Sequence, residues 1–85
     1  MKKIACPCCE YLAFDDSDIF PGSFRVCPVC YWEDDNVQFD DPDFRGGANS
    51  ESLNEARMNF RKFGAINRKY IQLVRAATEE ELRKE

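Results

Sequence analysis

The sequence predicts an α+β fold, in which a small β-hairpin module with two cysteine knuckles is followed by one or two C-terminal α-helices. Two Cys-Pro-x-Cys motifs, at 6–9 and 27–30, have 17 residues between them. A capping box precedes an amphipathic segment at 53–63. The chain has 85 residues, and domains this small often need a metal or a disulfide for stability. We therefore expect a single domain over 1–85, with the ribbon at about 1–49 and the helical part at about 50–85.

The first half is expected to form short strands around the cysteine motifs. Residues 11–14 (Tyr-Leu-Ala-Phe) are rich in strand formers, Pro21 and Gly22 mark a turn, and residues 23–26 alternate apolar and polar side chains. These features predict a hairpin that joins 11–14 to 23–26. Residues 33–49 have the composition of a loop, in which residues 37–39 could add a third strand.

The second half begins with a well-defined helix. Ser52 precedes Glu55 by three residues, which is the spacing of a capping box, and Gly64 is suited to end the helix in a left-handed conformation. One apolar stripe on this helix contains Leu53, Ala56, Phe60 and Phe63. Residues 66–77 fit a second helix less well, and 70–74 could equally be extended. Thr78 and Glu81 form a second possible capping box before a short C-terminal helix.

The cysteine spacing predicts a metal site with Cys6, Cys9, Cys27 and Cys30 as ligands. In each C-x2-C pair a tight turn can direct both sulfurs to one metal, and two pairs separated by about 15–20 residues are typical of zinc sites. Four thiolates complete a tetrahedral shell that suits one Zn2+ per chain. The expected module is therefore similar to a zinc ribbon or to rubredoxin.

Two other metal or redox interpretations stay open at this point. Iron in the same shell would give a rubredoxin-like electron carrier, because four thiolates do not by themselves select zinc over iron. Rubredoxin-type knuckles usually have glycine after the second cysteine, where this chain has Glu10 and Tyr31. A thiol redox pair of the thioredoxin kind is disfavoured, since that motif opens a helix and an apparent strand follows here.

The fifth cysteine, Cys8, lies inside the first motif. One interpretation is a small residue that fills the interior of the knuckle, because a free cysteine commonly packs as a small hydrophobic side chain. The other is a reactive or ligand-exchanging thiol. A negatively charged thiolate cluster nearby should raise the pKa of Cys8 and reduce its reactivity, which favours the packing role.

Composition and charge restrict the classes of function. The chain has neither an apolar run of membrane-spanning length nor a secretory signal pattern, so we expect a reducing, cytoplasmic location with free thiols. The net charge is −4, and residues 10–43 contain ten acidic side chains and one basic side chain, Arg25. Such a surface repels phosphate, which argues against nucleic acid as a partner.

The acidic loop after the second motif is a candidate interaction surface, with Glu33, Asp34, Asp40 and Asp41 as the candidate residues. The loop lacks the residue order of a calcium-binding loop. Some carboxylates could instead pair with basic residues of the 53–63 helix such as Arg57. Trp32 and Phe44 are expected to cover the metal knuckle. A solvated loop with no partner is the plainer alternative.

The segments "CPCC", "CPVCYWEDD" and "DPDFRGGANSESLNEARMNFRKFGA" resemble the cysteine-rich CPCC family of small bacterial proteins over about residues 5–65. The resemblance implies a zinc-ribbon-like site at Cys6, Cys9, Cys27 and Cys30 but no particular activity. Further residues match the family's signature without an assigned role: Trp32, Glu33, Asp34, Gly46, Gly47, Asn49, Arg57 and Asn59.

Two classes of function fit this sequence. The first is a metal-stabilised, non-enzymatic interaction module that binds a basic protein, for example an immunity or antitoxin-like inhibitor. The second is an electron carrier or an enzyme. The chain has no histidine, and no nucleophile is evident that its carboxylates could activate. The sequence therefore favours the interaction module.

Overall fold

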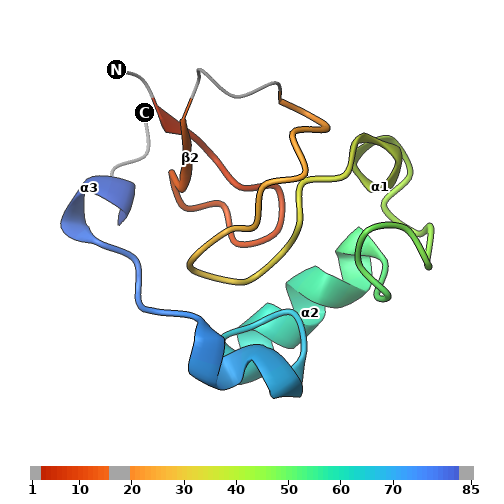
Figure 1. Ribbon diagram of the computed structural model, residues 1–85. Helices are drawn as coiled ribbons and strands as arrows, with labels where there is room; N and C mark the ends of the chain where they lie inside the picture. Colours follow the sequence, from red (N-terminus) through yellow and green to blue (C-terminus); the bar gives the residue numbers. More distant parts are fainter. Residues whose placement is uncertain (1–2, 16–19, 83–85) are drawn as a thin grey trace.

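The computed structural model describes residues 3–15 and 20–82 and has the α+β composition that the sequence predicts (Figure 1). This part of the chain contains one two-stranded antiparallel sheet and four short helices. In chain order the elements are β1 (Lys3–Ile4), β2 (Phe14–Asp15), α1 (Asn36–Asp40), α2 (Leu53–Phe63), the 3₁₀ helix η1 (Arg68–Leu73) and α3 (Glu79–Leu82). Among the described residues, no helix has the length and apolarity needed to cross a bilayer.

Each cysteine motif lies at the tip of its own narrow hairpin. β1 and β2 flank the first motif, with Ile4 opposite Phe14 in the antiparallel register. An isolated antiparallel bridge between Val26 and Glu33 flanks the second motif. The two motifs are therefore carried by two separate hairpins that have the same local arrangement.

The predicted hairpin between residues 11–14 and 23–26 is wrong in its pairing. Each segment pairs back across the adjacent knuckle instead: Phe14 pairs with Ile4, and Val26 forms a bridge to Glu33. Within 11–14 only Phe14 belongs to a strand. Leu12 instead donates its backbone N–H to the carbonyl of Glu81 at 2.9 Å. Strand propensity was present in this segment, but its pairing partner lies on the other side of the first cysteine motif.

Residues 37–39, which could have formed a third strand, belong to helix α1 instead. The Asp35 carboxylate caps this helix by accepting the N–H groups of Val37 at 2.8 Å and Gln38 at 3.4 Å. Gln38 is fully buried, and its side-chain NH2 donates to three carbonyls of the following loop, those of Phe44, Asn49 and Glu51. The cap and this buried amide therefore decide the conformation, in spite of the strand-forming side chains.

Helix α2 confirms the prediction for residues 53–63 and its capping box. The Ser52 hydroxyl accepts the Glu55 N–H at 3.0 Å, and the Glu55 carboxylate accepts the Ser52 N–H at 2.9 Å. Gly64 ends the helix with φ 81°, which is a left-handed conformation. Both ends of α2 are thus determined by residues that the sequence alone identifies.

The apolar stripe of α2 is only partly in the core. Leu53 and Ala56 are fully buried, whereas Phe60 and Phe63 are half-buried. Phe60 makes an edge-on contact with Tyr11, with ring centroids 6.4 Å apart. The helix therefore packs against the first knuckle along one side and leaves its C-terminal end partly open.

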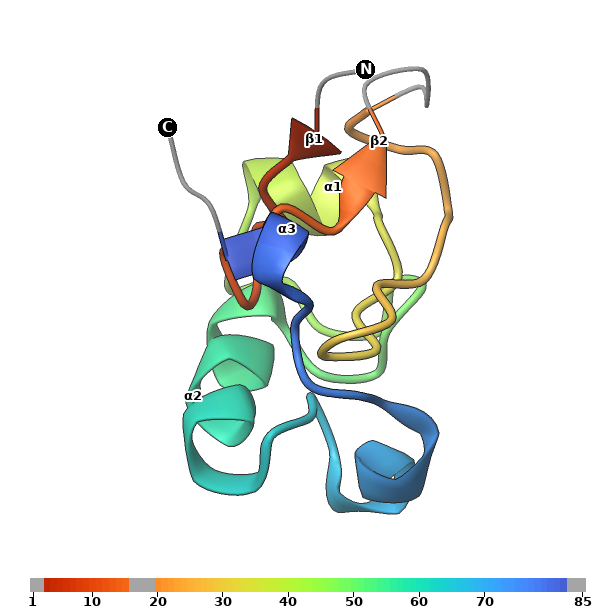
Figure 2. The same cartoon turned by 90° about the vertical axis from the view of Figure 1, so that its left-hand side faces the viewer.

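The C-terminal segment returns across the two hairpins (Figure 2). Residues 68–73 form the 3₁₀ helix η1, which replaces the longer second helix that the 66–77 pattern suggested. The predicted capping box before α3 is present: the Glu81 carboxylate accepts the Thr78 N–H at 2.9 Å and the Thr78 hydroxyl accepts the Glu81 N–H at 3.2 Å. Helix α3 lies beside the β1–β2 sheet in both views.

The core of the molecule contains the cysteine cluster itself. Trp32, Leu53 and Ile66 are the largest apolar side chains among those at most 2% exposed. All five cysteines are packed with these side chains in a single cluster. The candidate metal site and the hydrophobic core are therefore one unit, and a change in either one affects the other.

We predict that the Arg75–Glu81 ion pair gives a pH-dependent contribution to stability. Two N–O contacts of 2.8 Å with the Arg75 guanidinium lower the pKa of Glu81 from 4.5 to about 2. A lowered folded-state pKa means that the contribution is complete above about pH 5.5 and is lost as the pH falls through 4.5 toward 2. Glu81→Gln should therefore reduce the free energy of unfolding by roughly 1–3 kcal/mol at neutral pH.

Thermal and denaturant unfolding between pH 7 and pH 4 measures this effect, with Glu79→Gln on the same helix as the control. Glu79 is exposed, so its amide variant should remain within about 0.5 kcal/mol of the wild type. The prediction would be contradicted if Glu81→Gln lowers the free energy of unfolding no more than Glu79→Gln does. A loss of stability in Glu81→Gln that becomes larger as the pH falls would also contradict it.

Candidate metal centre

The two knuckles have matching backbone hydrogen bonds. In the first, Cys6 donates its N–H to the carbonyl of Tyr11 at 2.9 Å and accepts the N–H of Glu10 at 2.8 Å. In the second, Cys27 donates to the carbonyl of Trp32 at 2.9 Å and accepts from Tyr31 at 2.8 Å. Each leading cysteine is therefore fixed in a tight loop that directs its side chain inward.

Backbone amides also point at the sulfurs of these loops. The N–H groups of Cys8 and Val29 donate to Sγ of Cys6 and Cys27, each at 3.4 Å. Trp32 donates in the same way to Sγ of Cys30 at 3.4 Å. Such donors stabilise negative charge on sulfur, as metal-bound thiolates require.

Glu10 and Tyr31 occupy the position after the second cysteine of each knuckle, and both are left-handed, with φ 70° and 77°. Glycine is the usual residue for this conformation, because a Cβ there costs roughly 1–2 kcal/mol. The absence of glycine counted against a rubredoxin-type knuckle in the sequence. The structure removes that objection, since both non-glycine residues adopt the required conformation.

The four motif sulfurs converge on one point. All lie within 4.8 Å of one another, with Cys6 and Cys30 at 3.6 Å and Cys9 and Cys27 at 3.8 Å. These distances are far longer than a disulfide bond, and the cysteines are free. A tetrahedral shell with Zn–S bonds of about 2.3 Å has edges of about 3.8 Å. The donor set and its spacing therefore fit a metal ion bound by four thiolates.

The electrostatics of the cluster also favour a cation. Burial raises the pKa of Cys6, and the neighbouring thiols, with Cys27 first, raise the pKa of Cys30. Hydrogen bonds from the other thiols, chiefly that of Cys30, lower the pKa of Cys27. The protein groups therefore do not stabilise negative charge on Cys6, Cys27 and Cys30 together. A bound cation supplies the positive charge that allows all four sulfurs to ionise.

The second half of the chain holds both knuckles from outside. Arg57 on α2 donates its Nε–H to the carbonyl of Pro7 at 2.9 Å, and the Arg75 backbone N–H donates to the carbonyl of Pro28 at 3.1 Å. Pro7 and Pro28 are equivalent positions in the two motifs. Ile66 also donates its backbone N–H to the carbonyl of Cys30 at 2.9 Å. Arg57 therefore docks the helix through a knuckle carbonyl rather than through the acidic loop.

Cys8 corresponds in position to Val29 of the second knuckle. Both are buried, at 6% and 3% exposure, and both belong to the hydrophobic core cluster. The ligand group that the geometry defines contains the other four cysteines and not Cys8. Cys8 therefore occupies the place of a small apolar residue, which supports its interpretation as a packing side chain.

The acidic candidates are placed in very different surroundings. Asp34 is fully buried, and its Oδ2 accepts the N–H groups of Gly22 and Ser23 and the Ser23 hydroxyl at 2.7–3.0 Å. Its carboxylate is therefore a structural anchor, and Asp34 must be removed from the predicted interaction surface. Glu33 is half-buried, whereas Asp40 and Asp41 are exposed. Of the four candidates, only Asp40 and Asp41 are therefore exposed at the surface.

The aromatic residues predicted to cover the knuckle also differ in position. Trp32 is fully buried in the core beside the cysteines, as expected, while Phe44 is 41% exposed and lies outside the core cluster. Sequence reasoning missed Gln38 and the role of Asn49, which together hold the 44–51 loop. The "GGAN" segment was a signal for this loop, but nothing in the sequence indicated that a glutamine was its partner.

The fold and the site together define a class: a small α+β protein with a buried four-cysteine cluster able to hold a metal ion. The chain matches the Cysteine-rich CPCC family over residues 4–81 and belongs to that family. The match extends past the 5–65 range of the resemblance and includes η1 and most of α3. No curated protein matches the sequence significantly.

We predict that the left-handed conformation at Glu10 strains the first knuckle. Because Glu10→Gly and Glu10→Ala both remove the side chain, their difference isolates the backbone effect. The glycine variant should be more stable than the alanine variant by about 1 kcal/mol. Ala76, which is exposed and has no positive φ, provides the control. Ala76→Gly should destabilise the protein by roughly 0.5–1 kcal/mol. If alanine is more stable than glycine at position 10 as well as at position 76, the predicted strain is contradicted.

We predict that Cys8→Ala retains both metal and fold, with a stability loss limited to the removed packing. Cys9→Ala, which is matched in chemistry and adjacent in the chain, should lose the metal because it removes a ligand. Elemental analysis and native mass spectrometry of the two variants make the comparison. Metal loss in Cys8→Ala together with retention in Cys9→Ala would reverse the ligand assignment.

Proposed function

We propose that this protein is a zinc-stabilised, non-enzymatic interaction module that binds a protein with a basic surface. The main support for a structural metal is the group of four buried sulfurs, which would surround an ion completely. A metal site with four protein ligands has no open position for substrate, which is the pattern of structural rather than catalytic zinc. Because this site lies in the core, the ion would act mainly by holding the two hairpins together.

Iron is the second candidate metal, with electron transfer as the corresponding function. The observation in its favour is the left-handed residue after each second cysteine, at Glu10 and Tyr31, which is typical of rubredoxin-like knuckles. Four thiolates accept either metal. Zinc is our first choice, because the motif spacing is typical of zinc sites and the core position explains the metal without a redox partner.

The surroundings of the site support a role other than catalysis. The chain has no histidine to serve as a general base near neutral pH. The nearest acidic pair in sequence, Asp34 and Asp35, is buried and hydrogen-bonded to backbone amides of residues 22–23, 37–38 and 48. These carboxylates act as anchors for loops, so they are not placed to assist a substrate.

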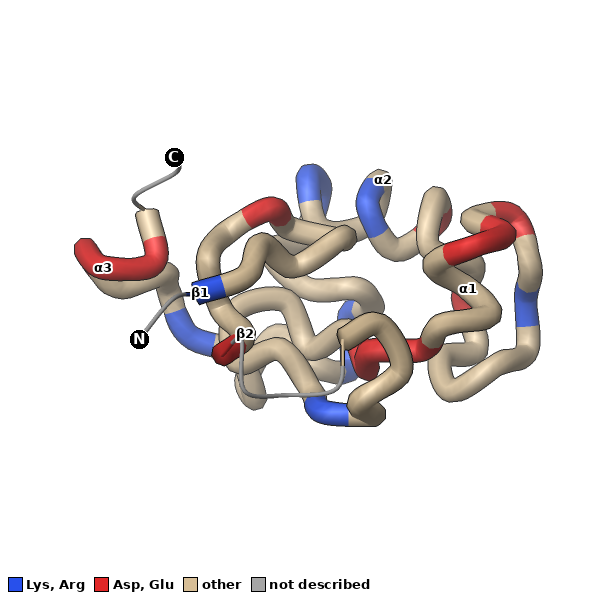
Figure 3. The backbone as a smooth tube through the Cα atoms, turned by 90° about the horizontal axis from the view of Figure 1, so that it is seen from above, with Lys and Arg blue, Asp and Glu red and all other residues tan. Residues whose placement is uncertain are grey.

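Charge supports a basic partner, but on a smaller surface than the sequence implied. Acidic residues gather at α1 and the loop after it and again at α3, while basic residues lie along α2 between them (Figure 3). Near α1 the exposed carboxylates are those of Asp40, Asp41 and Asp43, with one basic residue, Arg45, close in sequence. An exposed acidic group of this kind speeds encounter with a basic surface and is weakened by salt.

A concrete version of this proposal is an inhibitor of the immunity or antitoxin kind, which neutralises a basic protein by covering its surface. We place it in the reducing cytoplasm, where five free thiols and a thiolate-bound metal persist. The proposal requires neither nucleic acid nor a membrane as a partner.

We predict one zinc ion per chain and unfolding of the two hairpins when it is removed. Structural zinc contributes roughly 10–16 kcal/mol of apparent binding free energy, which is comparable to the stability of a whole domain. Cys27→Ser should therefore abolish cooperative unfolding near room temperature, and a strong chelator should do the same to the wild type. Elemental analysis together with circular dichroism tests this. Iron in place of zinc, with a red colour, would favour the electron carrier.

We predict that binding to the basic partner depends on Asp40 and Asp41. The double change Asp40→Asn and Asp41→Asn should weaken the complex, as should added salt, because both reduce the same electrostatic attraction. Glu79→Gln with Glu80→Gln is the matched control, since it removes equal charge from exposed positions on α3. Affinity capture from the native cell, followed by a purified binding assay, makes the measurement.

The outcome against this proposal would be a partner that binds both double variants equally and is indifferent to salt. Capture of no partner by any form of the protein would argue equally against the interaction module.

A further inference from the structure

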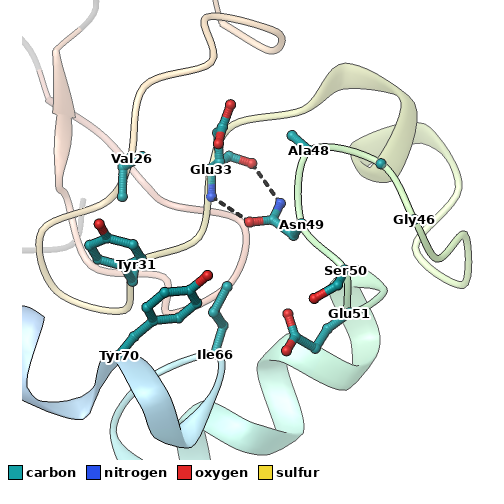
Figure 4. Close-up of a pocket in the computed structure, with 11 residues that line it drawn as sticks. Val26, Tyr31, Glu33, Gly46, Ala48, Asn49, Ser50, Glu51, Ile66 and Tyr70 are labelled. Atoms are coloured by element: carbon teal, nitrogen blue, oxygen red, sulfur yellow. Dashed lines mark hydrogen bonds between the residues drawn. The ribbon is translucent and has the colours of Figure 1, made fainter.

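A pocket of about 430 Å³ lies between the loop 46–51 and a pair of stacked tyrosines (Figure 4). Tyr31 and Tyr70 form one wall, with ring centroids 4.4 Å apart and planes inclined by 26°. Ile66 contributes an apolar surface between this wall and the loop. This volume is within the usual range for a small-ligand site and is ample for one large side chain.

The loop wall is fixed in advance of any ligand. The Asn49 side-chain amide forms two hydrogen bonds of 2.9 Å with the backbone of Glu33 and a third of 2.8 Å with Gln38. Gly47 is close to Asp35, so that a Cβ at Gly47 would lie 2.5 Å from the Asp35 carboxylate. Only glycine therefore fits at this position, which keeps the loop backbone packed closely against Asp35 and Gln38. Preorganisation of this kind lowers the entropic cost of binding.

The lining of the pocket is suited to a cation. Among the described residues, the lining includes Glu33 and Glu51 and no basic residue, and Figure 4 shows the Glu33 carboxylate directed away from the pocket. Figure 4 shows the Glu51 carboxylate and the hydroxyls of Ser50 and Tyr70 directed toward the centre of the pocket. Asn67 donates to Oε2 of Glu51, and Oε1 has no hydrogen-bond partner in the described part of the chain. An acceptor fixed in this way is available for a donor that enters the pocket.

We propose that this pocket binds an arginine side chain of the protein partner. The planar guanidinium of arginine has several N–H donors in fixed directions, which can bind a carboxylate and the neighbouring hydroxyls together. The compact ammonium of lysine lacks this planar arrangement of donors. The methylene stem of arginine would lie against Ile66 and the tyrosine wall, since such stems pack well on apolar surface. The inference rests on the proposed function and assigns one defined contact within it.

The test is a 1H–15N NMR titration of the metal-loaded full chain with a blocked Gly-Arg-Gly tripeptide. We expect saturable shifts at the amides of 46–51, Tyr31 and Tyr70, and weaker binding when salt is added. Glu51→Gln should weaken binding about tenfold, because it removes one charge-assisted pair while it can still accept from Asn67. Tyr70→Phe, which removes only the hydroxyl, should weaken binding roughly fivefold.

Two controls separate this site from general attraction to acidic protein. The citrulline tripeptide, which is the neutral counterpart of the arginine probe, should give no saturable shift. Glu79→Gln removes an exposed charge from α3 and should leave tripeptide affinity unchanged. The spectra of the variants also report directly whether each one is folded.

The inference is overturned by an absence of saturable shifts with the arginine probe, or by equal binding of the citrulline or lysine counterparts. Unchanged affinity in Glu51→Gln would overturn it as well. These failures differ from failure of the proposed function. If the tripeptide titration fails but the protein partner is still lost on changing Asp40 and Asp41, the proposed interaction module stands and only the arginine pocket is excluded.

Discussion

The convergence of four sulfurs from two hairpins is the constraint on which the rest of this structure depends. Neither hairpin is long enough to be stable alone, because the sheet has only two residues in each strand. The cysteines occupy the centre of the core, and Trp32, Leu53 and Ile66 pack around them. Buried thiols resist ionisation together, so the cluster reaches its full strength only with a cation. In a cluster of this kind, metal binding and folding are thermodynamically coupled.

Local signals in the sequence were sufficient for some elements and not for others. The motif spacing predicted that Cys6, Cys9, Cys27 and Cys30 would form one cluster. The spacing of Ser52 and Glu55 predicted the start of α2. Both signals are short-range, because the residues within each cysteine pair and within the capping box are three positions apart. The cysteine pairs also match one of the few ligand spacings that are typical of metal sites. Helix α1 could not be predicted in this way, because it depends on the buried amide of Gln38 and its contacts with a loop that follows later in the chain. Long-range polar contacts of this kind leave no periodic pattern.

The acidic run illustrates how net charge can mislead. A row of carboxylates after the second motif suggested one continuous negative surface. Asp34 and Asp35 are instead buried, and each satisfies several backbone donors that would otherwise lack partners. These buried carboxylates hold loops in place, and only a smaller group of acidic side chains near α1 is exposed. Charge in sequence and charge on the surface are therefore separate properties here.

The contacts of Arg57 and Arg75 with the knuckle carbonyls have a consequence for the order of assembly. All four candidate ligands lie within the first 30 residues, whereas the groups that clamp the outside of the knuckles come from residues 57 and 75. During synthesis from the N-terminus, the metal-binding half is complete before its cover has been made. Capture of the ion can thus come first, and the helices then close over a centre that is already formed.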